Sequence, residues 1–360
     1  MDMSIAAVQL TFRPWSLKVL RGSLPLVADV KPCLPSSIPV SGMRHARHRM
    51  DGWFPTMVWI YRLGMRGLWP MAVVLELEVI ATHVLLIVLF AAVLHATWNA
   101  LVKGASDKLV SMTAVVLGHA PFALLALPFV PLPDAASLPY VVAGAALHVG
   151  YQLFLLWAYR HGDLTQVYPV ARGTAPLIVA AVSVLIFREA LTTLQLVAIA
   201  TIGCGIMSLV LVRGGQGLHN PTGALLAVIT GCFVAGYSMV DGYGARAAGT
   251  AVGFYAWLTI LNAVAFAGIV AVTSPGTLRT TIRSHRKIMA VGGGASFAAY
   301  ALVVWAFTQA PIAVVTALRE TSIVFALLIG VFFLKERLNL VKLVSAMLTM
   351  LGALMLRFSK

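Results

Sequence analysis

Ten apolar runs, each long enough to cross a lipid bilayer, follow one another from about Val79 to the end of the 360-residue chain. A bilayer core of about 30 Å requires roughly 20 apolar residues in an α-helix. The runs cover approximately residues 80–102, 110–130, 139–159, 165–187, 193–212, 222–243, 251–273, 288–308, 312–334 and 340–357. Short connections with helix-breaking residues, such as Asn220–Pro221, separate them. We therefore expect an all-α integral membrane protein with ten transmembrane helices.

The composition supports a membrane location and argues against a nucleic-acid partner. Hydrophobic residues make up 60% of the chain and charged residues only 11%, whereas soluble domains carry about 25% charged residues. The net charge is +14, but most of the basic residues after Val79 stand in short connections between the apolar runs. Basic connections are typical of membrane proteins, in which they set the orientation.

Neither a disulfide, a metal site nor a cofactor is expected. The three cysteines, Cys33, Cys204 and Cys232, have no paired spacing such as CxxC. The glycine run Gly292–Gly294 has no strand and helix around it of the kind that a phosphate-binding loop requires, so we interpret it as a site of close helix packing.

Residues 1–78 differ from the rest of the chain. They are rich in proline and serine, contain the basic cluster Arg44, Arg47 and Arg49, and have no run long enough to span a bilayer. We expect a poorly ordered extension. A start codon assigned too far upstream is one interpretation, since Met65 and Met71 follow, and a targeting presequence is another.

An internal repeat relates the two halves of the membrane region. At a constant offset of 147 positions, charged and apolar residues of the fourth and fifth runs match those of the ninth and tenth. Each half, residues 79–213 and 214–360, has five runs, so the second half enters the membrane from the opposite side. The sequence therefore predicts two inverted five-helix repeats, an arrangement found in transporters. The matched pairs are Arg172–Arg319, Glu189–Glu336, Leu191–Leu338, Leu196–Leu343, Val197–Val344 and Gly205–Gly352.

Several motifs resemble the drug/metabolite transporter superfamily, EamA type, over about Val79 to Phe358. They are the His95–Ala–Thr–Trp–Asn99–Ala segment, the Tyr168–Pro176 segment, and the Arg188–Glu189 and Lys335–Glu336 pairs. The resemblance implies a ten-helix membrane transporter. It does not specify the substrate, because similar proteins are associated with amino acids, other metabolites, drugs, phosphorylated sugars and lipid-linked sugars.

Two arginines inside apolar runs are the main candidates for binding a solute. Arg172 stands about seven residues into its run, or roughly 10 Å below the surface, and Arg319 has the matching depth. Inverted topology predicts one arginine toward each entrance of a polar cavity, which suits an anionic or zwitterionic solute. An arginine in hydrocarbon costs about 2.5–3.5 kcal/mol. The alternative is that each side chain extends to the lipid headgroups.

Two acidic residues within the runs, Asp241 and Glu320, are candidates for proton coupling. Glu320 adjoins Arg319, and the alternative is that it only neutralises a neighbouring helix. Asp241 stands close to the end of its run, so a position near the membrane surface is its alternative interpretation.

The remaining candidates are polar and aromatic residues at helical spacing. His95 and Asn99 are four residues apart, as are Tyr237 and Asp241 in the other half, and His148 and Gln152 in the third run. Such faces line a pathway or form hydrogen bonds between helices. The predicted substrate-binding residues are Arg172, Arg319, Tyr168, His95, Asn99, Trp98, His148, Tyr151, Gln152, Tyr237 and Tyr300.

The orientation of the chain stays open at this point. The family resemblance implies that both ends of the ten-helix region are cytoplasmic. Positive charge then lies mainly outside, against the rule that basic connections are cytoplasmic. The basic residues on the side opposite to the ends are Lys103, Lys108, Arg160, Arg213, Arg279, Arg283, Arg286, Lys287, Lys335 and Arg337.

A secondary carrier for a small molecule is the function that these patterns favour, with alternating access between the halves. A flippase for a lipid-linked anionic sugar is the alternative. The runs show no cluster of acids, histidines and nucleophile that a membrane enzyme needs, and no filter loop typical of a channel. We expect a multi-pass protein of the cell (inner) membrane, as a monomer or homodimer.

Overall fold

The computed structural model describes residues 80–103, 107–162, 164–211, 221–333, 335 and 339–359. These residues all belong to one unit, Pro70–Lys360. The predicted extension 1–78, the boundary between the halves at 213/214, and Glu336 lie outside them.

Ten helical segments of the described residues are long and apolar enough to span a membrane, which confirms the predicted number. The eighth consists of a π-helical turn (η5, Ile288–Gly293) followed by α11, and the ninth consists of α12 and α13. The helices are α3 (Thr82–Lys103), α4 (Lys108–Ala126), α5 (Leu138–His161), α6 (Leu164–Leu185), α7 (Thr193–Leu211), α8 (Pro221–Ala247), α9 (Ala251–Thr273), α10 (Thr277–Ser284), α11 (Gly294–Phe307), α12 (Ile312–Arg319), α13 (Ser322–Phe332) and α14 (Leu340–Phe358).

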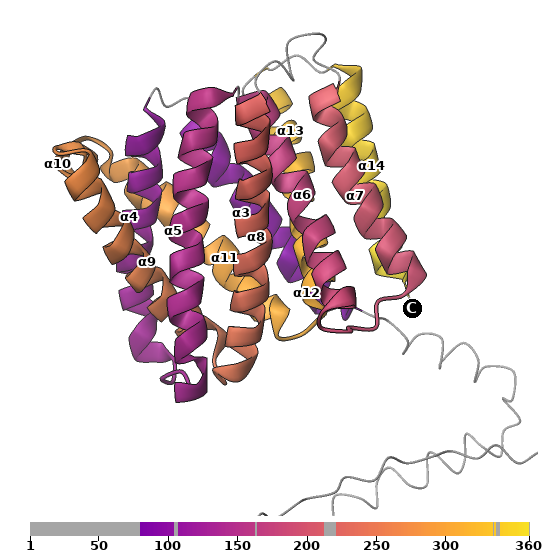
Figure 1. Cartoon of the computed structure of the whole chain (residues 1–360), viewed down its shortest axis with the longest axis horizontal. Helices are drawn as coiled ribbons and strands as arrows, with labels where there is room; N and C mark the ends of the chain where they lie inside the picture. The colour runs from indigo at the N-terminus through magenta and orange to yellow at the C-terminus, as the bar shows by residue number, and fades with distance from the viewer. Residues whose placement is uncertain are drawn as a thin grey trace, which may run out of the picture. The chain divides into compact units, whose positions relative to one another are not determined.

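The helix contacts have the pairing of two inverted repeats. α4 packs against α9, and α7 packs against α14, so the second and fifth helices of one half meet their counterparts in the other. The contact of α5 with α8 has its equivalent in the contact of α11 with α3. α6 meets α12, its counterpart, at the centre. Figure 1 shows α7 and α14 at one end of the bundle and α4 and α9 at the other.

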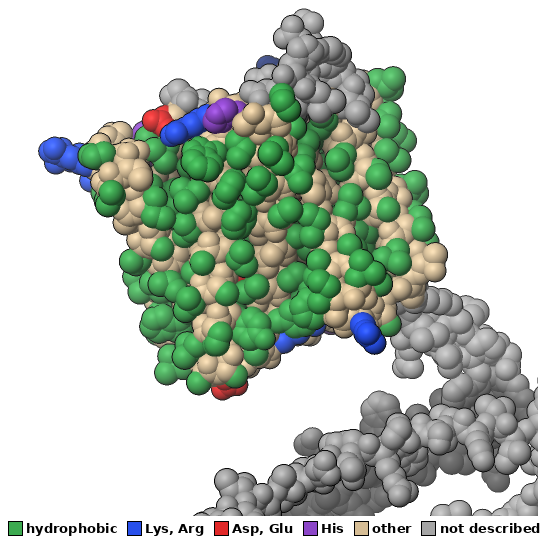
Figure 2. All heavy atoms as spheres, in the orientation of Figure 1, with side chains coloured by type: hydrophobic (Ala, Val, Ile, Leu, Met, Phe, Trp, Pro, Cys, Tyr) green, Lys and Arg blue, Asp and Glu red, His purple; other side chains and the backbone are tan. Residues whose placement is uncertain are grey.

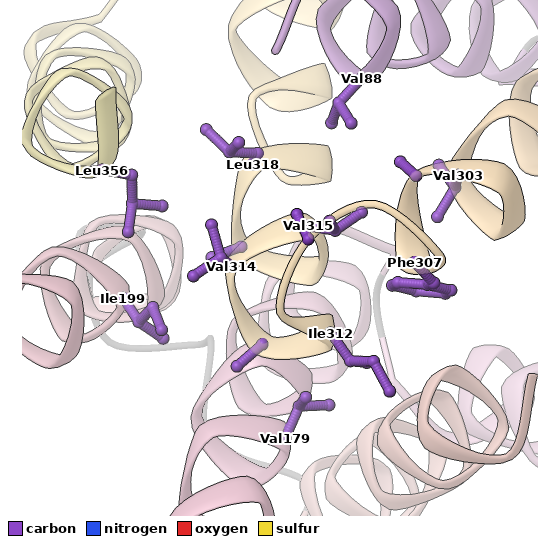
Figure 3. Packing of buried hydrophobic residues seen from close by; sticks show 14 of the residues in the cluster. Val88, Val179, Ile199, Val303, Phe307, Ile312, Val314, Val315, Leu318 and Leu356 are labelled. Atoms are coloured by element: carbon purple, nitrogen blue, oxygen red, sulfur yellow. The ribbon is translucent and has the colours of Figure 1, made fainter. Parts of the chain in front are cut away.

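α12 is enclosed by other helices on all sides. Every residue from Ile312 to Arg319 is buried. Apolar side chains from six helices surround it, several of which Figure 3 shows, and its last residue is therefore held away from lipid. The surrounding residues include Val88 on α3, Val179 on α6, Ile199 on α7, Val303 and Phe307 on α11, and Leu356 on α14.

The outer surface has the character expected of a membrane protein. Large apolar side chains such as Phe90, Val264 and Met347 are 57%, 66% and 62% exposed. Figure 2 shows apolar side chains over the middle of the visible face, with the basic side chains at its two edges. This distribution places lipid around the bundle and the charges at the two headgroup regions.

The glycine run predicted to permit close packing does so against α4. A Cβ atom on Gly293 would lie 2.6 Å from the Cα atom of Gly118 on α4. The π-helical turn η5 brings this glycine against its neighbour, and small residues are the usual way for membrane helices to approach closely.

One connection and one span differ from the prediction. The connection between the seventh and eighth spans contains the short helix α10, which starts after Gly276 in a left-handed conformation (φ 91°). Its exposed Arg279 and Arg283 and buried Thr281 form two faces, a pattern too short and too polar to appear among the apolar runs. The ninth span, predicted as one helix, is interrupted at Glu320 and Thr321.

Candidate functional site

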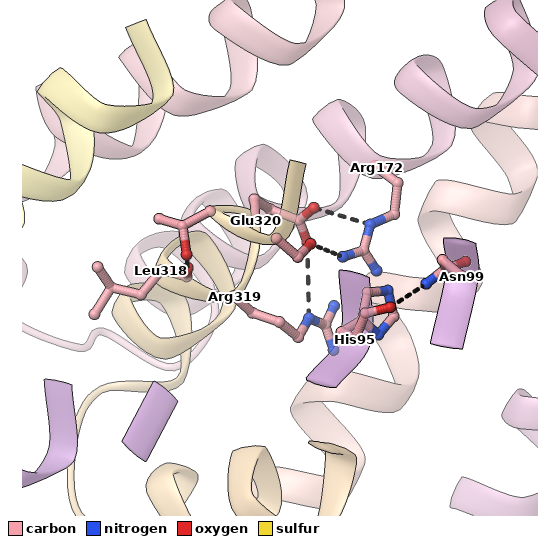
Figure 4. Close-up of polar contacts among 8 residues, drawn as sticks. His95, Asn99, Arg172, Leu318, Arg319 and Glu320 are labelled. Atoms are coloured by element: carbon pink, nitrogen blue, oxygen red, sulfur yellow. Dashed lines mark hydrogen bonds and ion pairs between the residues drawn. The ribbon is translucent and has the colours of Figure 1, made fainter. Parts of the chain in front are cut away.

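The two arginines of the repeat meet at one carboxylate in the interior of the bundle. Nε of Arg172 on α6 lies 2.9 Å from Oε2 of Glu320. Nε of Arg319, the last residue of α12, lies 3.7 Å from Oε1 of the same Glu320. Figure 4 shows both guanidinium groups directed toward this carboxylate. Arg172 is 7% exposed, Arg319 2% and Glu320 0%.

The expectation of one arginine at each entrance was wrong, and so was the alternative of side chains extending to the headgroups. Each arginine enters from its own side to a depth of roughly 10 Å, which leaves about 10 Å between them in a 30 Å core. α6 and α12 pack against each other at the centre. Two long side chains therefore span the remaining distance and reach one carboxylate.

Glu320 stands at the break between α12 and α13. The N–H groups of Glu320 and Thr321 donate to the carbonyls of Ala317 and Leu318, each at 3.0 Å, so the chain tightens into a turn with i→i+3 bonds. The C-terminal end of a helix favours a cation, and the N-terminal end favours an anion. This break therefore favours Arg319 at the end of α12 and Glu320 before α13.

α6 passes through Pro169 and Pro176 as one helix. Pro176 has no N–H group to donate to the carbonyl four residues earlier, which belongs to Arg172. The arginine thus lies at a weakened point of its helix, whereas its counterpart Arg319 lies at a complete break.

Tyrosine rings flank both guanidinium groups. Cζ of Arg172 lies 5.9 Å from the ring centroid of Tyr168. Cζ of Arg319 lies 6.0 Å from the ring of Tyr237 and 5.7 Å from that of Tyr300. Tyr151 meets Tyr237 edge to face at 5.6 Å. These cation–π contacts stabilise positive charge away from water.

A second buried acid forms its own cluster beside these rings. Oδ2 of Asp241 lies 2.8 Å from Nε2 of His148 and accepts a hydrogen bond of 2.8 Å from the hydroxyl of Tyr300. His148 stacks on Tyr237 with 4.1 Å between ring centroids. Asp241 is fully buried, so its interpretation as a residue near the surface was wrong. The reason is that α8 continues to Ala247, beyond the apolar run.

The remaining predicted residues lie on α3 and α5. Figure 4 shows His95 and Asn99 next to the two arginines, with Nδ2 of Asn99 donating to the carbonyl of His95 at 2.7 Å. His95 and Trp98 meet edge to face at 5.3 Å. Nε1 of Trp98 and Oε1 of Gln152 are buried without a hydrogen-bond partner. Buried polar atoms normally find a partner, so these two differ from ordinary core groups.

A protein-family model, the EamA-like transporter family, matches residues 82–211 and again residues 221–358. The chain belongs to the EamA-like transporter family. The two matches coincide with the two inverted halves, so the central site of this EamA protein lies where its two family repeats meet. The chain is accordingly a multi-pass membrane transporter.

Comparison with solved structures shows that the fold of this chain also occurs in other proteins. Twenty-nine chains in solved structures match this protein. One, described only as "Crystal structure of protein", has a TM-score of 0.61 and 17% sequence identity and covers 77% of this chain and 98% of its own. At this identity the likeness concerns the fold alone. No curated protein matches the chain.

Sequence reasoning missed Ser322, whose Oγ accepts a hydrogen bond of 3.4 Å from Nη2 of Arg172. The signal was present, because Arg319–Ser322 is a run of four polar residues inside an apolar span. Within the described part of the EamA chain, no group of three or more His, Cys, Asp or Glu residues is placed to hold a metal ion.

Proposed function

We propose that this EamA-family chain is a secondary transporter that moves a small anionic or zwitterionic metabolite by alternating access. The observation that carries the proposal is the meeting of Arg172 and Arg319 at the contact between the halves. Membrane interiors accept charged residues at a substantial energetic cost, and such residues usually mark a solute pathway.

The charges and rings of the site support an anionic group as the part of the solute that is recognised. Two arginines face one glutamate, so positive charge is in excess. Arginine presents several N–H donors in a planar arrangement that suits carboxylates and phosphates. The tyrosines beside both guanidinium groups offer hydroxyl groups and ring surfaces to the rest of the solute.

The location of the site supports alternating access. Arg172 belongs to the first half and Arg319 to the second, and α6 and α12 meet at the contact between the halves. In transporters with inverted repeats, a solute bound at such a contact is exposed to either side when one half rocks against the other.

The proposal extends to proton coupling through Asp241. Its carboxylate contacts His148 and Tyr300 and is separate from the glutamate that holds the arginines. A carboxylate beside a histidine can exchange a proton without disturbing the ion pairs of the solute site. Asp241 is therefore favoured over Glu320 as the coupling residue.

A soluble solute is favoured over the lipid-linked sugar of the flippase alternative. A flippase needs a headgroup site that opens laterally to lipid. Both arginines are buried, at 7% and 2% exposure, and α12 is enclosed by apolar side chains. This arrangement suits a small solute that enters from water when the halves move.

The test is the melting temperature of the purified protein in the presence of amino acids, carboxylates, sugar phosphates, phosphonates and cationic drugs. A ligand that binds the folded state raises this temperature by mass action. We expect stabilisation by anionic or zwitterionic compounds, lost in Arg172→Ala and Arg319→Ala and kept in Arg283→Ala, an exposed arginine of α10. Stabilisation by cationic compounds that survives both central substitutions would overturn the proposal.

A further inference from the structure

The two central arginines are not equivalent, because Glu320 holds one of them more closely. Arg172 lies 2.9 Å from Oε2 of Glu320 and also donates to Ser322. Arg319 lies 3.7 Å from Oε1, a distance too long for a hydrogen bond. Nε and Nη2 of Arg319 are buried and have no hydrogen-bond partner, whereas Arg172 lacks one only at Nε and donates from Nη2 to Ser322.

The charges at this point leave one positive charge without a close partner. The arginines contribute two positive charges and Glu320 one negative charge. Asp241, the other acid inside the described spans, is held by His148 and Tyr300 rather than by either arginine. Burying a charged group that lacks hydrogen bonds costs free energy. A ligand that brings one negative charge and acceptors aligned with the arginine would lower that cost, so its binding here is favourable.

The position of Glu320 lets it act as a fixed counter-charge. Its backbone forms the turn between α12 and α13, and its carboxylate is fully buried. Both of its oxygens lack a well-aligned hydrogen bond.

We propose that Arg319 is the arginine that binds the solute, and that Glu320, held by Arg172, limits the site to one negative charge. The inference rests on the proposed function and specifies its substrate class as solutes with a single carboxylate. The carboxylate binds Nε and Nη2 of Arg319 between the rings of Tyr237 and Tyr300. Together with Glu320 it then neutralises both arginines.

A dianion is disfavoured for the same reason. Its second negative charge would meet Glu320 without a further cation among the described residues of the site. Removal of the Glu320 charge should leave two free arginines and make room for a second carboxylate. The preference for a solute with one negative charge over a solute with two is thus expected to depend on Glu320.

The test compares butyrate with succinate, which have four carbons each and differ by one carboxylate. Binding to the purified full chain is measured by thermal stability over a range of concentrations. We expect the wild-type protein to bind butyrate more tightly than succinate. Glu320→Gln should improve succinate affinity relative to butyrate by at least about tenfold, whereas Arg319→Ala should lose butyrate binding.

Glu189→Gln is the control. It also neutralises one acid, but one that follows the end of α6 and faces Tyr243 and Arg246 rather than the central arginines. The ratio of the two affinities should therefore stay as in the wild type. An unchanged ratio in folded Glu320→Gln, or failure of both compounds to bind it, would overturn the inference. Stabilisation by other anions, lost in Arg172→Ala, would leave the proposed function in place.

Glu320→Ala provides a second test that remains valid if the glutamine variant does not fold. This substitution leaves a space beside Arg172 that a small free carboxylate can fill. Formate should raise the melting temperature of Glu320→Ala more than that of the wild type or of Glu189→Ala. Equal effects of formate on all three proteins would contradict the assignment of Glu320 as the counter-charge.

Discussion

Nε2 of His148 on α5 lies 2.8 Å from Oδ2 of Asp241 on α8, in a part of the bundle where the carboxylate is fully buried. Gly144 on α5 permits this approach, because a Cβ atom there would lie 2.7 Å from Oδ1 of Asp241. A carboxylate and an imidazole in contact can share and exchange a proton. The two helices thus bring a carboxylate and an imidazole together at a point where neither contacts an arginine directly.

Asp241→Asn is expected to uncouple transport from protons. The amide keeps the shape of the carboxylate but cannot carry a proton, so uptake driven by a pH gradient should fall by about tenfold or more. Exchange of labelled for unlabelled solute across vesicles should continue. Uptake in proteoliposomes with and without a pH gradient measures both. Gradient-driven uptake at the wild-type rate in this variant and in His148→Gln would exclude the pair from coupling.

Arg246→Ala is expected to destabilise the protein without changing its choice of solute. Arg246 at the end of α8 donates from Nε to the carbonyl of Phe307 at 2.8 Å and from Nη2 to that of Ala310 at 3.0 Å. It therefore fixes the turn that leads into α12. Hydrogen bonds from a charged group contribute about 1.5–3 kcal/mol each. The melting temperature should fall clearly in Arg246→Ala and hardly at all in Arg283→Ala, while the relative affinities for anions stay unchanged.

The sequence predicted the spans and the repeat because both depend on local composition and on position along the chain. It also selected the residues that surround the central carboxylate, since charged and aromatic residues inside apolar runs are few. The meeting of Arg172 and Arg319 could not be predicted, because it depends on the crossing of α6 and α12. The burial of Asp241 was missed because the end of α8 could not be recognised from its composition. α8 extends through Gly242, Gly244 and Arg246, residues that lower the apolar character of its end.

Gly293→Ala is expected to destabilise the contact of the π-helical turn with α4. The added methyl group would lie 2.6 Å from the Cα atom of Gly118, which is backbone and cannot move aside cheaply. Overpacking of this kind costs about 1–3 kcal/mol. Gly268→Ala on α9 is the control, because a Cβ atom there meets nothing within 4 Å. The control should melt at or above the wild-type temperature, and equal losses in both variants would contradict close packing as the cause.

The membrane side that carries α10 is expected to face the cytoplasm. Arg279, Arg283, Arg286 and Lys287 follow one another there, and the chain has no acidic residue between Asp241 and Glu320. Basic residues within about 15–20 positions of a span determine its orientation, and those within this window before Thr82 are Arg62 and Arg66, fewer than the four beside α10.

Cysteine labelling in intact cells tests this orientation. Ser284 in α10 and Ala136 between α4 and α5 are both exposed. They lie on opposite sides of the membrane, because the chain crosses it an odd number of times between them, through the third to the seventh span. In a variant with all three native cysteines replaced, a maleimide that does not cross membranes should label Ala136→Cys but not Ser284→Cys. After permeabilisation both should react. The reverse pattern would place α10 outside, and the excess of basic residues would then not determine the orientation of this chain.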